Sequence, residues 1–303
     1  MGKLGYTPHP KKTVPSLTYP MKTLNYRLIS FVVLTLTAIT GLPLLSTAAQ
    51  TPEPLRLLKP KIISIRPHDP AAYTQGLLLH DGFFYESTGL EGQSTLRKVD
   101  PRTGEVLQRT DLAPNLFGEG LALVDDRFIQ ITWKSQVALV YDRETFKPLD
   151  TFTYIGEGWG LCYDGESLYM SNGSSALTRR DPKTFKELET ISVTLEGQPV
   201  TNLNELECVG GSVYANVWFT NQIMEIDKRT GRVKTIIDAA GLLTPEETAA
   251  VGYWGTMNGI AYDAETGRFF LTGKFWPWVF EVELVTFLDP SYKTPTPLPP
   301  AKK

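Results

Sequence analysis

The chain has 303 residues, of which 42% are hydrophobic and 21% charged, so it can form one or two globular domains and is neither disordered nor fibrous. The first 49 residues contain five basic and no acidic residues, which leaves 25 basic against 33 acidic residues, a balance of −8, in the remainder; this charge disfavours nucleic acid as a partner. Three histidines and two cysteines are too few for a His-rich zinc site or a zinc ribbon, so we expect no metal site built on soft ligands.

Residues 1–50 have the pattern of an extension followed by an export signal. The uncharged segment 28–49 follows Lys22 and Arg27 and ends in small residues, as a signal peptide does. Met21 would open such a signal, and residues 1–20 are then either the result of a start codon assigned too far upstream or a cytoplasmic extension. The alternative is an uncleaved membrane anchor, since about 20 apolar residues suffice to span a bilayer. Either way we expect the remainder to be exported, to the periplasm or outside the cell, and to touch a membrane only through this segment.

Export affects the expected redox state of the two cysteines, Cys162 and Cys208. An oxidising compartment permits a disulfide between them. Two buried free thiols are the alternative.

Five copies of one short pattern follow, each a Gly or Glu, an apolar stretch, a Gly/Asp turn and a second apolar stretch. The copies begin 44, 40, 45 and 54 residues apart, at Gly76, Gly120, Gly160, Glu205 and Gly259. A second repeated turn lies between them, at Asp100, Asp142, Asp181 and Asp227. Two hairpins in about 45 residues predict four short strands per unit, the length of a β-propeller blade. We therefore predict an all-β fold, a five-bladed β-propeller over residues 51–288.

The two ends of this region predict how the ring closes. The fifth copy has only one further strand, at 279–283, while an unpartnered strand, 61–65, precedes the first copy. An N-terminal strand that completes the last blade would remove the exposed sheet edge. One short helix is predicted in the insertion before the fifth copy, where Thr244 and Glu247 form a capping box around Pro245. Residues 289–303 are rich in proline and predict a disordered, solvated tail.

Polar and aromatic residues occupy equivalent positions in the five units. Immediately before each repeat stand Gln75, Glu119, Trp159, Asn204 and Asn258. Thirteen residues beyond each start stand Gly89, Trp133, Gly173 and Trp218, with Lys274 fifteen beyond the fifth. Because equivalent positions in a propeller converge on one axis, we expect a small cup with indole walls, one carboxylate, three carboxamides and an ammonium near its rim.

Each of these residues also has a purely structural interpretation. The tryptophans could pack between blades, Lys274 could extend its ammonium to solvent, and Asn258 could bond only to backbone. Glu119 lies between two glycines, which would let a ligand approach the backbone closely. Glu157 is out of register and is predicted to be a surface loop acid. Of Glu205 and Glu207, one is expected to face the channel or a neighbouring blade.

The sequence resembles the plant and bacterial type of glutaminyl-peptide cyclotransferase over about residues 60–286. The motifs that carry the resemblance keep their order and spacing, and they are 73–77 (YTQGL), 86–90 (ESTGL), 115–120 (NLFGEG), 131–134 (ITWK), 158–161 (GWGL), 203–207 (LNELE), 216–218 (NVW), 257–260 (MNGI) and 271–274 (LTGK). The resemblance implies a five-bladed propeller that converts N-terminal glutamine of peptides or proteins to pyroglutamate. Such an acyltransferase is unrelated in fold to the zinc-dependent animal enzymes.

The resemblance also implies roles for residues. Glu119 would be the acid–base, Gln75 and Asn204 substrate-binding amides, and Lys274 a group at the rim. Tyr73 stands where the family often has phenylalanine. We therefore expect catalytic roles for Glu119, Asn204 and Lys274, and substrate contacts from Gln75, Tyr73, Trp133, Trp159, Trp218, Phe117 and Asn258.

This chemistry suits these residue types. The α-amine of the substrate attacks its own side-chain carboxamide, so the site has to hold one folded rotamer, and an aromatic cup can do this. One carboxyl group can take the proton from the amine and pass it to the departing nitrogen, and burial against indoles would raise its pKa towards neutrality. Amides of Asn204 or Gln75 could stabilise the oxyanion. No metal or cofactor is expected, and we expect a monomer.

Two alternatives remain open from the sequence alone. A non-catalytic propeller could bind peptides or sugars on the same aromatic cup. A lactonase-like enzyme could hold a calcium ion on Glu119, Asn204 and Asn258.

Overall fold

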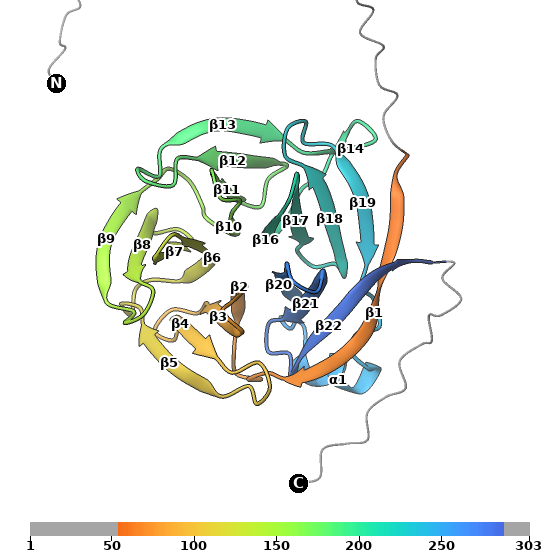
Figure 1. The fold of residues 1–303 in the computed structure, drawn as a ribbon, viewed down its shortest axis with the longest axis horizontal. Coiled ribbons are helices and arrows are strands. Elements are labelled where there is room, and N and C mark those ends of the chain that lie inside the picture. The colour runs from red at the N-terminus through yellow and green to blue at the C-terminus, as the bar shows by residue number, and fades with distance from the viewer. Residues whose placement is uncertain (1–53, 288–303) are drawn as a thin grey trace, which may run out of the picture. The chain divides into compact units, whose positions relative to one another are not determined.

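The computed structural model describes residues 54–287, which form β-strands and one short helix arranged around a common centre (Figure 1). The predicted signal segment at 1–50 and the tail at 289–303 lie outside the described residues. Within 54–287, no helix has both the length and the apolar character needed to cross a bilayer.

Three sheets contain four consecutive antiparallel strands each. The first contains β2 (Thr74–His80), β3 (Phe83–Thr88), β4 (Thr95–Val99) and β5 (Val106–Asp111). The second contains β6 (Gly118–Val124), β7 (Arg127–Thr132), β8 (Val137–Asp142) and β9 (Pro148–Thr153). The third contains β10 (Leu161–Tyr163), β11 (Leu168–Met170), β12 (Ala176–Arg180) and β13 (Glu187–Ser192). A two-stranded ribbon of β14 (Thr194–Leu195) and β15 (Gln198–Pro199) follows.

The remaining strands form one eight-stranded sheet, in the order β16-β17-β18-β19-β1-β22-β21-β20. Their bounds are β16 (Leu203–Val209), β17 (Ser212–Val217), β18 (Gln222–Asp227), β19 (Val233–Asp238), β1 (Arg56–Pro67), β22 (Trp278–Thr286), β21 (Arg268–Gly273) and β20 (Met257–Asp263). β1 pairs antiparallel with β22 along most of its length and parallel with β19 over Arg56–Leu58. The N-terminal strand is therefore the partner that the sequence lacked for β22, and it also joins β19.

The predicted turns hold the outer hairpins of the sheets. At Asp142, Asp181 and Asp227 one carboxylate oxygen accepts hydrogen bonds from the backbone N–H and the hydroxyl of the threonine three residues later, at 2.6–2.8 Å. Each carboxylate thus closes the turn between the third and fourth strands of its sheet. The repeated Asp and Thr are explained by this local bonding.

The innermost strands lie side by side around the centre. β2 contacts β6 and β20, β6 contacts β10, β10 contacts β16, and β16 contacts β20 (Figure 1). The repeat glycines permit this approach: a Cβ on Gly120 would lie 2.3 Å from the Leu161 nitrogen, and one on Gly160 would lie 2.0 Å from the Asn204 oxygen. A side chain at either position would push two inner strands apart.

Glu205 occupies the repeat position that lacks glycine. Its carboxylate is 1% exposed and accepts the backbone N–H groups of Leu77 at 3.2 Å and Ile260 at 2.9 Å. It therefore links β16 to both β2 and β20. Burial, with a contribution from Glu207, raises the pKa of Glu205 well above its ordinary value.

Apolar side chains pack between neighbouring sheets. Ile129 and Ile131 of the second sheet, for example, share a buried cluster with Leu161 and Leu168 of the third. A disulfide between Cys162 on β10 and Cys208 on β16 links the third sheet to the eight-stranded one.

The single helix among the described residues, α1 (Pro245–Val251), has the predicted capping box. Glu247 N–H donates to the Thr244 hydroxyl at 3.2 Å, and Thr244 N–H donates to the Glu247 carboxylate at 2.8 Å. Trp278 on β22 donates its indole N–H to the other Glu247 oxygen at 2.6 Å, which ties α1 to the sheet. The helix lies in the long insertion between β19 and β20 that accounts for the wider last repeat.

Candidate active site

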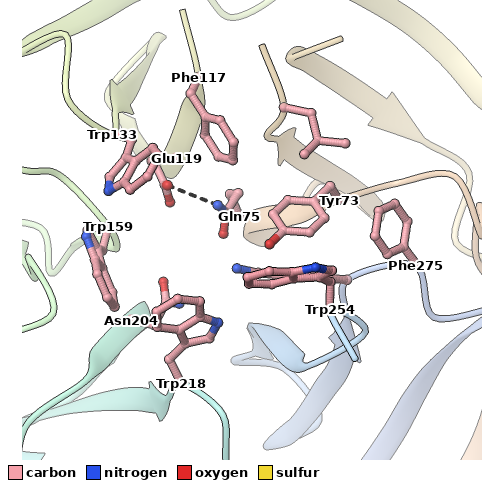
Figure 2. Close-up of a pocket in the computed structure, with 12 residues that line it drawn as sticks. Tyr73, Gln75, Phe117, Glu119, Trp133, Trp159, Asn204, Trp218, Trp254 and Phe275 are labelled. Carbon is pink, nitrogen blue, oxygen red and sulfur yellow. Dashed lines mark hydrogen bonds between the residues drawn. The ribbon is translucent and has the colours of Figure 1, made fainter. Parts of the chain in front are cut away.

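A cavity of about 390 Å³ lies at one end of the inner strands (Figure 2). Its lining combines buried polar side chains with aromatic rings that, apart from the buried Tyr73, are half-buried or exposed. It consists of Tyr73, Gln75, Leu90, Phe117, Glu119, Trp133, Trp159, Asn204, Trp218, Trp254, Lys274 and Phe275. Nine of the ten side chains assigned from the sequence as catalytic or substrate-contacting are in this set, and Asn258 is not. The two rings of equivalent positions therefore meet at one place.

Irregularities in the inner strands direct these side chains into the cavity. The strand register shifts between Thr74 and Gly76 in β2, between Gly118 and Leu121 in β6, and between Leu203 and Leu206 in β16. Gln75, Glu119 and Asn204 lie in these three bulges, and a bulge turns a side chain away from its regular alternation. The same local feature, repeated around the centre, therefore points three different polar groups at one space.

The glycines of the second ring leave room for rings from neighbouring positions. A Cβ on Gly89 would lie 2.4 Å from the Phe117 ring, and one on Gly173 would lie 2.6 Å from the Trp159 ring. The alternation of glycine and tryptophan in the sequence is thus a packing requirement of the cavity wall.

Glu119 is the buried carboxyl group of the cavity, with 5% of the residue exposed. Gln75 donates its amide N–H to Glu119 Oε1 at 3.0 Å (Figure 2), while Oε2 has no partner within the described part of the chain. The hydroxyl of Ser87 donates to the Glu119 carbonyl and fixes its backbone. Burial raises the pKa of Glu119 well above its ordinary value; Lys274 opposes this effect and Glu157 adds to it.

Asn258 lies behind Gln75 instead of on the cavity wall, which corrects the predicted ligand contact. It is fully buried and donates to the Thr74 carbonyl at 2.9 Å and to Gln75 Oε1 at 3.1 Å. Because the Gln75 carbonyl accepts from Asn258, its amide nitrogen faces Glu119. Asn258 therefore orients Gln75.

Lys274 is more deeply buried than predicted. Only 2% of the residue is exposed, so it lies within the cavity and not at its rim. Its ammonium lies 4.6 Å from the centre of the Tyr73 ring and 5.6 Å from that of Trp218. Burial lowers the pKa of Lys274 to about 8, and the charge of Glu119 opposes this shift.

Glu157 lies in a surface loop, as predicted, with 40% of its side chain exposed, but it also contacts two walls of the cavity from behind. Its Oε2 accepts the indole N–H of Trp133 at 2.8 Å and that of Trp159 at 3.0 Å, so one carboxylate fixes two walls of the cavity. Lys134 lies 3.9 Å from its other oxygen and 3.8 Å from the centre of the Trp133 ring. The sequence offered one signal, the Gly-Glu-Gly at 156–158 that echoes the one around Glu119.

The remaining walls are aromatic rings packed at steep angles. Trp159 meets Trp218 at 5.2 Å and 88°, and Phe117 meets Trp133 at 5.6 Å and 61°. Two buried polar atoms at the cavity, Asn204 Oδ1 and Trp218 Nε1, have no hydrogen-bond partner in residues 54–287. Their hydrogen-bonding capacity is therefore unused in this structure.

Sequence reasoning missed three lining residues, Leu90, Trp254 and Phe275. Leu90 and Phe275 directly follow second-ring positions and have φ angles of +84° and +62°. Bulky residues rarely adopt this conformation, which costs roughly 1–3 kcal/mol and persists where the surroundings enforce it.

The described residues contain no group of three or more His, Cys, Asp or Glu side chains placed to hold a metal ion. The donors predicted for a shared calcium ion, Glu119, Asn204 and Asn258, do not all face the cavity, since Asn258 lies behind Gln75. That set does not fit a calcium site.

The chain is similar to known proteins in both sequence and structure. Residues 34–284 match the family model described as glutamine cyclotransferase. A curated glutaminyl-peptide cyclotransferase of Arabidopsis thaliana is 38% identical over 235 residues, which cover 76% of this chain and 72% of the relative. The crystal structure of Myxococcus xanthus glutaminyl cyclase superimposes with a TM-score of 0.69 at 39% identity, covering 76% of this chain and 98% of that one.

Proposed function

This chain belongs to the glutamine cyclotransferase family and acts as a glutaminyl-peptide cyclotransferase, and we propose that Glu119 moves the protons in its reaction. The observation that carries this proposal is the burial of one carboxyl group, with one oxygen unpartnered, inside an aromatic cavity.

The reaction requires two proton movements and no external nucleophile. The α-amine nitrogen of an N-terminal glutamine attacks the Cδ carbon of its own side chain and forms the lactam C–N bond. The bond from Cδ to the amide nitrogen breaks, and ammonia leaves. The amine loses a proton and the departing nitrogen gains one, so a single carboxyl group between them balances the reaction.

Glu119 has the geometry and basicity for this role. Gln75 occupies Oε1, so Oε2 is the oxygen that takes the proton from the amine and returns it to the leaving nitrogen. Burial brings the pKa of the Glu119 carboxyl group closer to the ordinary α-amino pKa of about 8, which reduces the free-energy cost of proton transfer from the amine. Positioned proton transfer of this kind contributes about 10² to 10⁴ in rate.

Asn204 and Trp218 supply the unpartnered groups that hold the substrate. Asn204 Oδ1 can accept from the α-amine, and Trp218 Nε1 can donate to a carbonyl oxygen of the peptide. Lys274 places a positive charge in the cavity, where it favours the Glu119 carboxylate and the oxyanion that forms on the attacked carboxamide. The indole walls exclude water and hold the glutamine side chain folded onto its own amine.

We also propose that catalysis is independent of metal. The donor set of the cavity supports this, because it combines one carboxylate with carboxamides and an ammonium whose charge would repel a cation.

A five-bladed propeller is the architecture we propose for this fold. Each innermost strand, β2, β6, β10, β16 and β20, begins its own run of consecutive antiparallel strands. The eight-stranded sheet then divides into two blades between β19 and β1, which pair over only three residues.

The basic and apolar pattern of residues 22–49 supports the further proposal that the enzyme is exported. Sequencing the amino terminus of the mature protein tests this proposal.

The function is tested by incubating the purified protein with a peptide that begins with glutamine and following its mass. We expect the loss of one ammonia, and no change in a matched peptide whose α-amine is acetylated, because that nitrogen is the nucleophile. Dialysis against EDTA should leave the rate unchanged. A folded protein that binds the peptide without releasing ammonia would indicate a binding protein, and a rate abolished by EDTA would contradict metal independence.

A further inference from the structure

Three exposed aromatic residues, Phe219, Tyr253 and Trp254, form a connected surface that we call the aromatic ledge. Their exposed fractions are 44%, 74% and 53%. The ring of Phe219 lies 5.2 Å from that of Tyr253 and 5.9 Å from that of Trp254, and Tyr253 and Trp254 are 5.1 Å apart. Exposed rings in mutual contact are unusual on a soluble surface and mark binding sites.

The ledge is continuous with the cavity. Trp254 belongs to both, since it also lines the cavity (Figure 2). Phe219 stacks on the cavity residue Trp218 with ring centres 4.3 Å apart and planes 32° from parallel. A molecule that fills the cavity and extends out of it can therefore contact the aromatic ledge continuously.

The backbone holds the ledge in place. Tyr253 and Trp254 occupy a turn closed by a hydrogen bond from Gly255 N–H to the Gly252 carbonyl at 3.1 Å. The indole of Trp276 donates to the Gly255 carbonyl at 2.9 Å, and the backbone N–H of Lys274 donates to the Thr256 carbonyl at 2.9 Å. The segment that directly follows β21 and carries Lys274 thus anchors the turn, while the left-handed backbone of Phe219, with φ of +62°, fixes the second part of the ledge.

The chemistry determines which part of a peptide meets the ledge. Both reacting groups, the α-amine and the carboxamide, belong to the first residue and must reach Glu119, Asn204 and Lys274, which are at most 5% exposed. The second residue therefore leaves through the open side of the cavity. On the Trp133 side, Lys134 lies 3.8 Å over the indole and already covers one face of that ring. The ledge offers uncovered rings.

We infer that the aromatic ledge is a subsite for the side chain of the second substrate residue and selects aromatic or large aliphatic side chains there. This inference rests on the proposed function. The two segments that form the ledge, 218–221 and 252–258, contain no charged residue, so a charged second residue gains no counter-charge from them. Stacking between aromatic rings supplies the selectivity.

The test compares kcat/KM for three peptides that differ only in the second residue: Gln-Phe, Gln-Gly and Gln-Glu. For the wild-type protein we expect Gln-Phe to exceed both others about five- to tenfold, mainly through a lower KM. In Tyr253→Ala and in Phe219→Ala the ratio of Gln-Phe to Gln-Gly should fall to about two or below. Leu149→Ala, which removes an equally exposed apolar side chain (58%) on β9, should leave the ratio unchanged.

The outcomes separate the subsite from the activity. Equal cyclisation of all three peptides by the wild-type protein would overturn the subsite and leave the proposed function intact. A preference for Gln-Glu would place the second residue near Lys134 and also overturn it. Equal losses on Gln-Phe and Gln-Gly in both ledge variants would show a merely structural role. Failure of the wild-type protein on every peptide would instead contradict the proposed function.

Discussion

Glu119 and Lys274 share the cavity, and burial moves their pKa values towards each other. Desolvation raises the pKa of the carboxyl group and lowers that of the ammonium to about 8, while their mutual attraction opposes both shifts. The site therefore changes its charge closer to neutral pH than a free glutamate or a free lysine would, which favours a group that takes and returns a proton.

Lys274→Met should change the pH dependence of kcat/KM at both ends. Removing the ammonium removes the charge that lowers the pKa of Glu119, so the acid limb moves to higher pH. The decrease above about pH 8, where Lys274 loses its proton, should disappear. Steady-state rates with one peptide across pH 5 to 10 measure this, because the titration of the substrate amine is common to both proteins. Profiles that superimpose after scaling would show that Lys274 does not act on Glu119.

For single residues, the position within the repeated unit was the informative signal in the sequence. Gln75, Glu119 and Asn204 were predicted from equivalent repeat positions, and each occupies a bulge of an inner strand. The surface position of Glu157 was predicted, but its contacts with two indoles were not, because loop conformation and not register brings the carboxylate to them. Trp254 was missed because it lies in the insertion, which has no counterpart in the other units.

At the scale of elements, β1 and β22 are held by one buried carboxylate. Glu281 on β22 accepts from Ser64 and Arg66 of β1, both at 2.6 Å, and from Arg268 of β21 at 2.8 Å. These partners lower the pKa of Glu281 to about 2 even though its burial acts in the opposite direction. The stabilisation is complete above the ordinary value of 4.5 and is lost as the pH falls towards 2.

Glu281→Gln should lower the free energy of unfolding by about 2 kcal/mol at pH 7 and should weaken the loss of stability between pH 5 and 3. Urea unfolding at pH 7 and pH 3.5 measures both effects. The matched control is Glu283→Gln on the same strand, whose side chain is 42% exposed beside Lys61, and its effect should stay below about 1 kcal/mol. Equal effects of the two substitutions would contradict a special role for Glu281.

Among the elements, those with local signals were predictable. The Asp-Thr turns and the capping box of α1 depend on neighbours within a few residues, and both occur where predicted. The parallel pairing of β1 with β19 depends on residues almost 180 positions apart, and no local pattern specifies such a partner. The two-stranded β14–β15 ribbon was also not predicted, since strands of two residues have no detectable periodicity.

For the whole molecule, the sheets are joined by side-chain packing and by the disulfide between β10 and β16. Cys162 and Cys208 are separated by 46 positions in the sequence, and closing a loop of this length stabilises the folded state by about 4 kcal/mol in the chain-entropy description. The sequence left two free thiols as an alternative, because cysteine spacing alone does not fix pairing.

The double variant Cys162→Ser/Cys208→Ser should therefore unfold about 2 to 4 kcal/mol more easily than the wild-type protein. The cyclisation rate of this variant at 25 °C should equal that of the wild-type protein, since neither cysteine lines the cavity. Urea unfolding with and without dithiothreitol provides the check, because the reductant should destabilise the wild-type protein and not the variant. A wild-type midpoint that is insensitive to the reductant would contradict this.

The most direct test of the mechanism is kcat/KM for Glu119→Gln with a glutamine-initiated peptide. Gln keeps the size and one acceptor of Glu119 but cannot carry the proton, so the rate should fall at least about 100-fold while the protein remains folded. Glu157→Gln is the matched control: it makes the same chemical change at the second carboxylate of the site and should cost about tenfold at most, since its oxygen still accepts from the indoles. Full activity of Glu119→Gln, or equal losses in the two variants, would contradict the assignment of Glu119 as the acid–base.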